Sequence, residues 1–194
     1  MGKFMIKKIL KVYGLPRSGT NVVQTLLSYN FKNYVAQIAD HNVHYLGWKH
    51  GWLLSDSTYN FVEKITKEQI LFIFTYRDYN SWQEAIIKRH TGTWEFPWHY
   101  WNRQGDKFVF NTPLGPEVYE SMQDFYNKRH QDYQDFCNRH PRTTITINYK
   151  DLKNNQTRIV EQIQKKFNLE LCVDQIFTIK KTINSLGQPT EMPY

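Results

Sequence analysis

The sequence has few cysteines and no long apolar run. Cys137 and Cys172 are its only two cysteines in 194 residues, and their separation fits no metal-binding spacing. Such sparse cysteine usage is typical of a reduced compartment, so a cytoplasmic protein is expected. No stretch approaches the ~18 apolar residues of a transmembrane helix, and lysines interrupt the first 13 residues where a signal peptide would need an apolar core. A protein without a membrane span is therefore predicted.

Long basic runs are also missing, although the chain is basic overall. It has 25 Lys and Arg against 18 Asp and Glu, a formal net charge of +7, but its densest basic groups are mere pairs. Proteins that bind a nucleic-acid backbone usually show basic runs or a recognisable module. Nucleic acid is therefore not expected as a partner. A polyanionic small ligand, an acidic acceptor or a plain solvated surface explains the same surplus.

Three segments have the character of β-strands. Residues 9–13 and 144–148 are short and rich in β-branched or apolar side chains, and residues 70–76 (ILFIFTY) are almost wholly apolar. A continuous apolar run of that length is typical of a strand buried on both faces of a parallel sheet. Other segments show the helical spacing of apolar residues. They are residues 20–29, a stretch that follows Arg77-Asp78 and continues through Arg89, residues 116–138, and residues 155–167 after the last strand.

This alternation of strands and helices predicts a single α/β domain over residues 1–194. The expected architecture is a three-layer sandwich around a central parallel sheet of four or five strands. Residues 97–116 are irregular and rich in aromatic side chains, and are expected to form a substrate lid.

A glycine-bounded loop, Gly14-Leu15-Pro16-Arg17-Ser18-Gly19-Thr20-Asn21, joins the first strand to its helix. It has the glycine spacing of the nucleotide triphosphatase P-loop, but Thr20 replaces the lysine that reaches the outer phosphates, and Asn21 replaces the magnesium-binding Ser or Thr. The cation of this loop, Arg17, lies inside it. Backbone N–H groups of residues 18–21 and the Ser18 and Thr20 hydroxyls predict a cradle for a single phosphate. The alternative is an ordinary turn with a helix cap.

The segment Pro16-Arg17-Ser18-Gly19-Thr20 resembles the 5′-phosphosulfate-binding loop of sulfotransferases. Two later segments resemble further motifs of that family, in the same order. Arg77-Asp78, after the apolar strand, resembles the start of R-[N/D]-P, and Tyr149-Lys150-Asp151-Leu152, after the strand at 144–148, resembles R-Y-E-D-L. The resemblance covers most of residues 12–167. It implies a P-loop-like enzyme that uses 3′-phosphoadenosine 5′-phosphosulfate (PAPS), releases 3′-phosphoadenosine 5′-phosphate (PAP) and needs no metal.

The resemblance also implies roles for the matching residues. Arg77 would bind the 3′-phosphate and Tyr149 would contact the adenine. Ala85 stands where the family has a serine, eight residues after the arginine, and Ser81, one helical turn earlier, is expected to substitute for it. The 5′ end of the donor would be bound by Arg17, Ser18, Gly19, Thr20 and Asn21.

Sulfonate transfer needs a base that removes a proton from the acceptor as it attacks sulfur, and a histidine with a pKa near ~6.5 is suited to this. His50, in Trp48-Lys49-His50-Gly51, resembles the family's catalytic K-H segment and is the first choice. Arg17 is expected to stabilise the developing charge. Lys49 is not expected to assist, because neighbouring side chains in an extended strand point to opposite faces. Alternative bases are His44, His41, Asp40 and Glu95.

The acceptor is expected to be a small molecule or a carbohydrate that offers a hydroxyl or an amine. An aromatic wall for it would come from Trp94, Phe96, Trp98, Tyr100 and Trp101, and the alternative is that these residues pack a lid. Lys180 and Lys181 match the family's C-terminal basic segment poorly, and are expected to be solvated. Two other functions remain open. One is a P-loop kinase or nucleotide hydrolase, against which the missing lysine counts. The other is a nucleotide-binding homologue without activity, which Ala85 and Tyr79 (in place of the family's proline) suggest.

Overall fold

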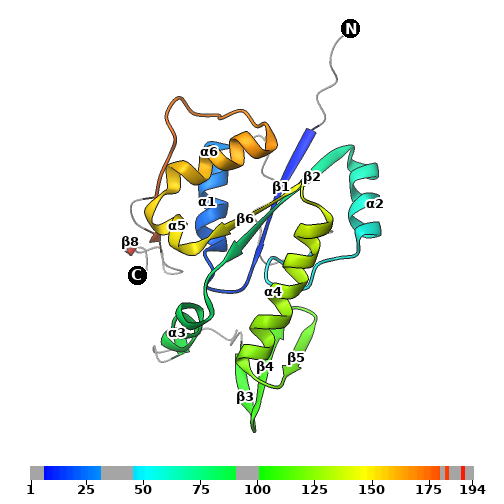
Figure 1. The fold of residues 1–194 in the computed structure, drawn as a ribbon, viewed down its shortest axis with the longest axis vertical. Helices are drawn as coiled ribbons and strands as arrows, with labels where there is room; N and C mark the ends of the chain where they lie inside the picture. Colours follow the sequence, from blue (N-terminus) through cyan, green and yellow to red (C-terminus); the bar gives the residue numbers. More distant parts are fainter. Residues whose placement is uncertain (1–6, 32–45, 91–100, 180–181, 184–188, 191–194) are drawn as a thin grey trace.

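The computed structural model describes residues 7–31, 46–90, 101–179, 182–183 and 189–190 (Figure 1). Its main sheet consists of three parallel strands in the order β1-β2-β6. Strand β2 is central and pairs with β1 from Lys7↔Glu68 to Gly14↔Thr75, and with β6 from Phe72↔Thr144 to Tyr76↔Asn148. The strands are β1 (Lys7–Gly14), β2 (Glu68–Tyr76) and β6 (Thr144–Asn148).

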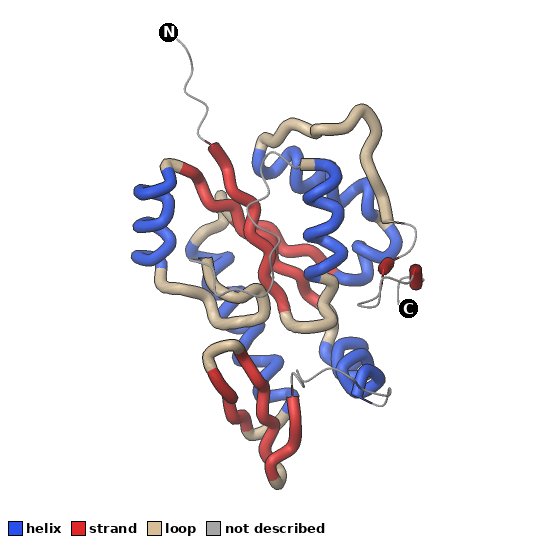
Figure 2. The backbone as a smooth tube through the Cα atoms, turned by 180° about the vertical axis from the view of Figure 1, so that it is seen from behind, coloured by secondary structure: helices blue, strands red, loops and turns tan. Residues whose placement is uncertain are grey.

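Helices cover both faces of this sheet (Figures 1 and 2). Alternate residues of β1 and β2 enter two separate clusters, since side chains alternate along a strand. Leu10 and Leu71 pack with one group of helices, and Ile9 and Ile70 pack with the other. The first group is α1 (Thr20–Asn30), α5 (Tyr149–Asn154) and α6 (Gln156–Phe167); the second is α2 (Asp56–Thr66) and α4 (Met122–Arg139).

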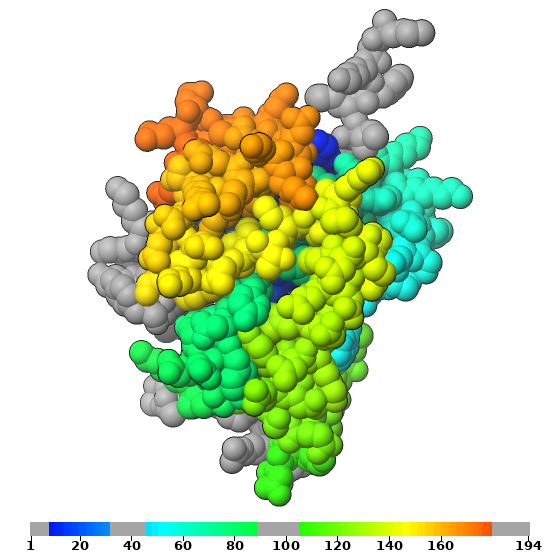
Figure 3. Space-filling view, in the orientation of Figure 1, coloured from blue at the N-terminus to red at the C-terminus, as the bar shows by residue number. Residues whose placement is uncertain are grey.

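The observed architecture confirms the α/β class and the three parallel strands predicted from apolar runs. In the space-filling view the α5 and α6 segments, in yellow and orange, cover the upper left of the face shown, and little of the blue β1 segment is visible beside them (Figure 3). Among the described residues the parallel sheet has three strands, so a fourth or fifth strand stays a prediction. None of the helices described here is long and apolar enough to cross a membrane.

The structure of residues 101–119 differs from the one expected from the sequence. They form an antiparallel sheet where an irregular lid and the start of a helix were expected, because Gly105 (φ 62°) and Gly115 (φ 121°) allow tight turns between short strands. Helix α4 therefore begins only at Met122, after Ser121 caps it by accepting a hydrogen bond from Asp124 N–H at 3.0 Å. The strands are β3 (Trp101–Gln104), β4 (Lys107–Thr112) and β5 (Gly115–Tyr119).

The small sheet packs against the N-terminal half of α4 and belongs to the same hydrophobic cluster as α3 (Tyr79–His90). The C-terminal half of α4 packs on the main sheet (Figure 1). Phe108 and Phe110 of β4 are buried there beside Phe125. Two more short strands, β7 (Thr182–Ile183) and β8 (Pro189–Thr190), pair with each other.

Candidate functional site

The carboxyl ends of the three parallel strands bring the predicted site residues to one edge of the sheet. Gly14 lies opposite Thr75, and Tyr76 lies opposite Asn148 in the strand register. The glycine-bounded loop, Arg77 and Tyr149 each follow directly after one of these strands. Ligands of open α/β sheets bind at this edge. Three motifs that are far apart in the sequence are therefore neighbours in the fold.

The loop after β1 is packed so closely that glycine is required at both ends. A Cβ atom on Gly14 would lie 2.0 Å from Thr75 Oγ1, and one on Gly19 would lie 2.9 Å from both Tyr149 and Leu152. Gly19 also has a φ of 97°, in the left-handed region. The two glycines hold the loop against β2 and against the first turn of α5.

Arg17 is in the left-handed conformation as well, with a φ of 67°. For a residue with a large side chain this conformation is unfavourable, and it persists only where surrounding contacts enforce it. Such residues cluster at binding and catalytic sites.

Ser18 is buried and faces the sheet. Its hydroxyl donates to Leu15 O at 2.6 Å and lies 2.6 Å from Thr75 Oγ1, and its backbone N–H donates to Leu15 O at 3.1 Å. In this structure Ser18 therefore fastens the loop to β2. A direct contact between the Ser18 hydroxyl and a phosphate stays a prediction.

The N-terminus of α1 has the features of an anion site. Its N-cap residue is Gly19, no side chain caps it, and no acidic residue lies in its first turn. The first N–H groups of a helix, here including those of Thr20 and Asn21, have no partner within the helix, and the helix dipole gives this end a partial positive charge. Backbone and dipole both favour a phosphate here.

Residues 46–50 lie beside β1, and hydrogen bonds join them to it. The Tyr13 hydroxyl donates to Leu46 O, Lys11 Nζ donates to Gly47 O at 2.6 Å, and Gly14 N–H donates to Lys49 O at 2.9 Å. These bonds place the segment containing His50 next to the start of the loop.

His50 is buried, and its Nδ1 lies 2.6 Å from Gly14 O. Since a carbonyl oxygen can only accept a hydrogen bond, Nδ1 must carry the proton in this contact. In the neutral ring Nε2 is then the basic nitrogen. The Trp48 ring packs edge-on against the imidazole, with 5.3 Å between centroids. The bond to Gly14 thus sets both the tautomer and the orientation of the predicted base.

The position of Lys49 corrects the expectation that it points away from the site. The segment is a turn rather than an extended strand, so the alternation of side chains does not apply. Lys49 Nζ donates to Asn21 Oδ1 at 2.7 Å and to Gln24 Oε1 at 3.2 Å. A buried cation therefore lies beside the first turns of α1, supplied by another segment of the chain.

Arg77 contacts both the loop and the adenine-binding candidate. It donates from Nε to Ser81 Oγ at 2.8 Å and from Nη1 to Arg17 O at 3.1 Å, and its guanidinium lies 4.3 Å from the centre of the Tyr149 ring. Ser81 thus lies at Arg77, and its substitution for the serine missing at Ala85 stays a prediction. The Tyr126 hydroxyl donates to Arg77 O at 2.8 Å and fixes the backbone.

Two contacts of the loop have no motif in the sequence. Trp82 Nε1 donates to Pro16 O at 2.8 Å, and Thr75 lies beneath Gly14 and Ser18. A tryptophan in a helix and a threonine in an apolar strand resemble ordinary core residues, so only the fold shows that they hold the loop.

Several candidates lie outside the described residues. They are Asp40, His41 and His44, then Trp94, Glu95, Phe96, Trp98 and Tyr100, and finally Lys180 and Lys181. Trp101 begins β3. In the described part of the chain, no group of three or more His, Cys, Asp or Glu side chains is arranged to hold a metal ion.

No protein-family model matches the chain, and neither a curated protein nor a solved structure matches it.

Proposed function

We propose that the chain is a sulfotransferase that moves the sulfonate group of PAPS to a hydroxyl or amine of an acceptor. The observation that carries the proposal is the convergence of Arg77, Tyr149 and His50 on the loop between β1 and α1. Each comes from a different segment, and each belongs to a motif that resembles the same family. The proposal includes a P-loop-like fold with four or five parallel strands.

The donor lies across the carboxyl edge of the sheet. Its 5′-phosphosulfate binds at the N-terminus of α1, to N–H groups of Gly19, Thr20 and Asn21 and to the Arg17 side chain. The 3′-phosphate binds Arg77 and Ser81. Arg77 uses Nε and one Nη1 hydrogen on protein partners. The remaining N–H groups of its guanidinium are proposed to donate to the phosphate.

His50 is the general base of the transfer. Its Nε2 takes the proton of the acceptor group while the acceptor oxygen or nitrogen forms a bond to sulfur. The bond between sulfur and the bridging phosphate oxygen breaks, and PAP leaves with the electron pair of that bond. Arg17, and Lys49 beside α1, stabilise the negative charge that develops on the bridging oxygen. The reaction written this way needs no metal ion.

Calorimetry with PAP tests the donor site. We expect wild-type protein to bind PAP, and we expect Arg77→Ala to weaken binding at least about 10-fold, because a charge-assisted contact to phosphate contributes about 1.5–3 kcal/mol. Arg142→Ala is the matched control: the same charge is lost from an exposed residue that precedes β6, at the opposite edge of the sheet. Absence of PAP binding by the wild-type protein would contradict the proposal.

Transfer of radiolabelled sulfonate from PAPS to a panel of phenols, sugars and amines tests the reaction. His50→Ala is expected to keep PAP affinity and to abolish transfer. Magnesium-dependent binding of ATP in place of PAP would support a kinase or nucleotide hydrolase instead. Binding of PAP without transfer to any acceptor of the panel would support an inactive homologue.

A further inference from the structure

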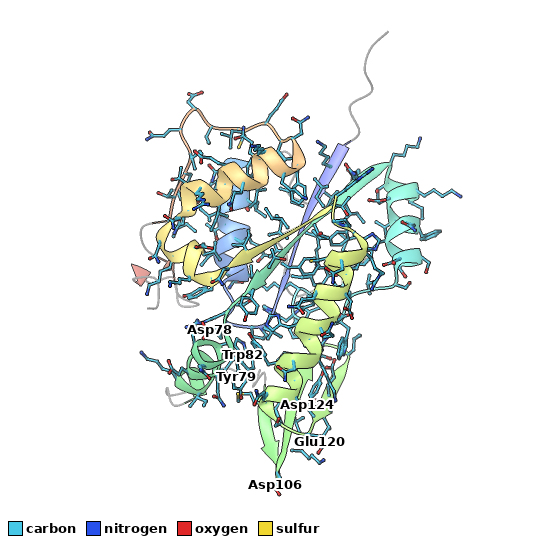
Figure 4. All side chains as sticks on the ribbon, viewed as in Figure 1. Asp78, Tyr79, Trp82, Asp106, Glu120 and Asp124 are labelled. Carbon is cyan, nitrogen blue, oxygen red and sulfur yellow. The ribbon has the colours of Figure 1, made fainter. Side chains whose placement is uncertain are left out.

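Two successive carbonyl groups of the loop are held by side chains that follow β2. Trp82 donates to Pro16 O at 2.8 Å and Arg77 donates to Arg17 O at 3.1 Å. Figure 4 shows Trp82 together with Asp78 and Tyr79 at the start of α3, next to the end of β2. The proposed function explains Arg77 but gives no role to the indole N–H of Trp82.

These two bonds flank Arg17. Pro16 O belongs to the peptide unit before Arg17, and Arg17 O belongs to the unit after it. Because each peptide unit is planar, holding the direction of both carbonyls restricts the φ and ψ of the residue between them. That residue has a φ of 67°, a conformation that a non-glycine residue leaves readily unless it is held.

The Trp82 indole is itself held firmly. It is only 1% exposed and packs against Tyr79, Phe125 and Tyr126, with ring centroids 6.1, 5.9 and 5.3 Å away. Many apolar side chains would fill such a space, but most lack a donor that reaches the loop. The N–H is therefore the part of Trp82 that the packing alone does not require.

We propose that Trp82 is a positioning residue for the 5′ end of the donor. Its N–H holds Arg17 in the left-handed conformation and so directs the Arg17 guanidinium toward the phosphosulfate. The inference rests on the proposed function. The inference adds that the 5′ site depends on α3 through the hydrogen bond from Trp82 to Pro16 O. Arg77 holds Arg17 O as well, and it also binds the 3′-phosphate directly.

Calorimetry of Trp82→Phe with three nucleotides tests this role. PAP and adenosine 5′-monophosphate are expected to bind the variant about 5- to 10-fold more weakly than they bind the wild-type protein. This loss corresponds to one well-placed hydrogen bond. Adenosine 3′-monophosphate, which lacks the 5′-phosphate, is expected to bind as it does to the wild-type protein. In an Arg17→Ala background, Trp82→Phe should cause less than about a 2-fold further loss, because the side chain that it positions is gone.

Two further variants separate positioning from packing. Trp52→Phe makes the same change at a half-exposed tryptophan that stacks on Arg129, and it should leave all three affinities unchanged. If Trp82→Phe does not fold, β-(3-benzothienyl)alanine at position 82 keeps the two-ring shape and removes only the N–H. It should give the same selective loss.

The outcomes separate the two proposals. Equal weakening of all three nucleotides, or unchanged affinity for the 5′-phosphorylated pair, would overturn the role of Trp82 and leave the proposed function standing. A wild-type protein that binds none of the three nucleotides would overturn both.

Discussion

Gly19→Ala is the substitution that most directly tests how the loop is packed. A Cβ atom at this position would lie 2.9 Å from Tyr149 Cδ2 and from Leu152 Cδ1, and the φ of 97° is one that alanine rarely adopts. The backbone conformation contributes about 1–2 kcal/mol and the overpacking about 1–3 kcal/mol. We therefore expect the free energy of unfolding to fall by about 2–5 kcal/mol, a large share of the 5–15 kcal/mol typical of a domain.

Gly105→Ala provides the matched control. Gly105 also has a positive φ, of 62°, but a Cβ atom there would meet nothing within 4 Å. Only the backbone conformation contributes there, so a loss of about 1–2 kcal/mol is expected. Urea unfolding at constant pH measures both variants, and the comparison is valid if the slope m is unchanged.

The double variant Gly19→Ala with Tyr149→Ala isolates the clash. Removing the tyrosine ring relieves one of the two close contacts, so the combined loss should be smaller than the sum of the single losses. Equal losses for Gly19→Ala and Gly105→Ala, together with strict additivity in the double variant, would refute the packing of the loop against α5.

Two other predictions concern α4. Burial lowers the pKa of His130 from 6.5 to about 4. The unfolded chain therefore binds more protons between these values, and stability is lost as the pH falls, by up to about 3 kcal/mol. Urea unfolding at pH 7 and at pH 4.5 measures this loss of stability. His130→Phe should make the difference in the free energy of unfolding between the two pH values smaller, and an unchanged difference would contradict the prediction. Glu117→Gln should lower stability by about 2–4 kcal/mol, because Glu117 is the ion-pair partner of the fully buried Arg129. Glu120 is exposed, so Glu120→Gln should change the free energy of unfolding little. Similar urea midpoints for Glu117→Gln and Glu120→Gln would contradict the predicted contribution of the Arg129–Glu117 pair.

The main sheet was largely predictable because local composition dictates it. The apolar run at 70–76 lies within β2, the β-branched run at 144–148 coincides with β6, and the helical spacing at 20–29 coincides with α1 apart from one residue. The small sheet was not predictable in the same way. Its strands are short, and the two glycine turns that separate them resemble an irregular loop in the sequence.

The sequence predicted which residues belong to the site, but not how their side chains are arranged. The motifs indicated that the loop, Arg77, Tyr149 and His50 belong together. The parallel register brings the loop, Arg77 and Tyr149 to one edge, and the hydrogen bond between Gly14 N–H and Lys49 O brings His50 there. The arrangement of each side chain depends on partners far away in the chain. Trp82 and Pro16 are 66 positions apart, and His50 and Gly14 are 36 apart, so no local pattern encodes those contacts.

The central claim is that the carboxyl edge of the sheet binds a nucleotide phosphorylated at both its 5′ and 3′ positions. A crystal structure of the protein with PAP tests it most directly. We predict 5′-phosphate oxygens about 3 Å from the backbone nitrogens of Gly19 and Thr20, and the 3′-phosphate on the Arg77 guanidinium. PAP bound elsewhere on the molecule, or bound here with its 5′-phosphate away from the loop, would contradict the account.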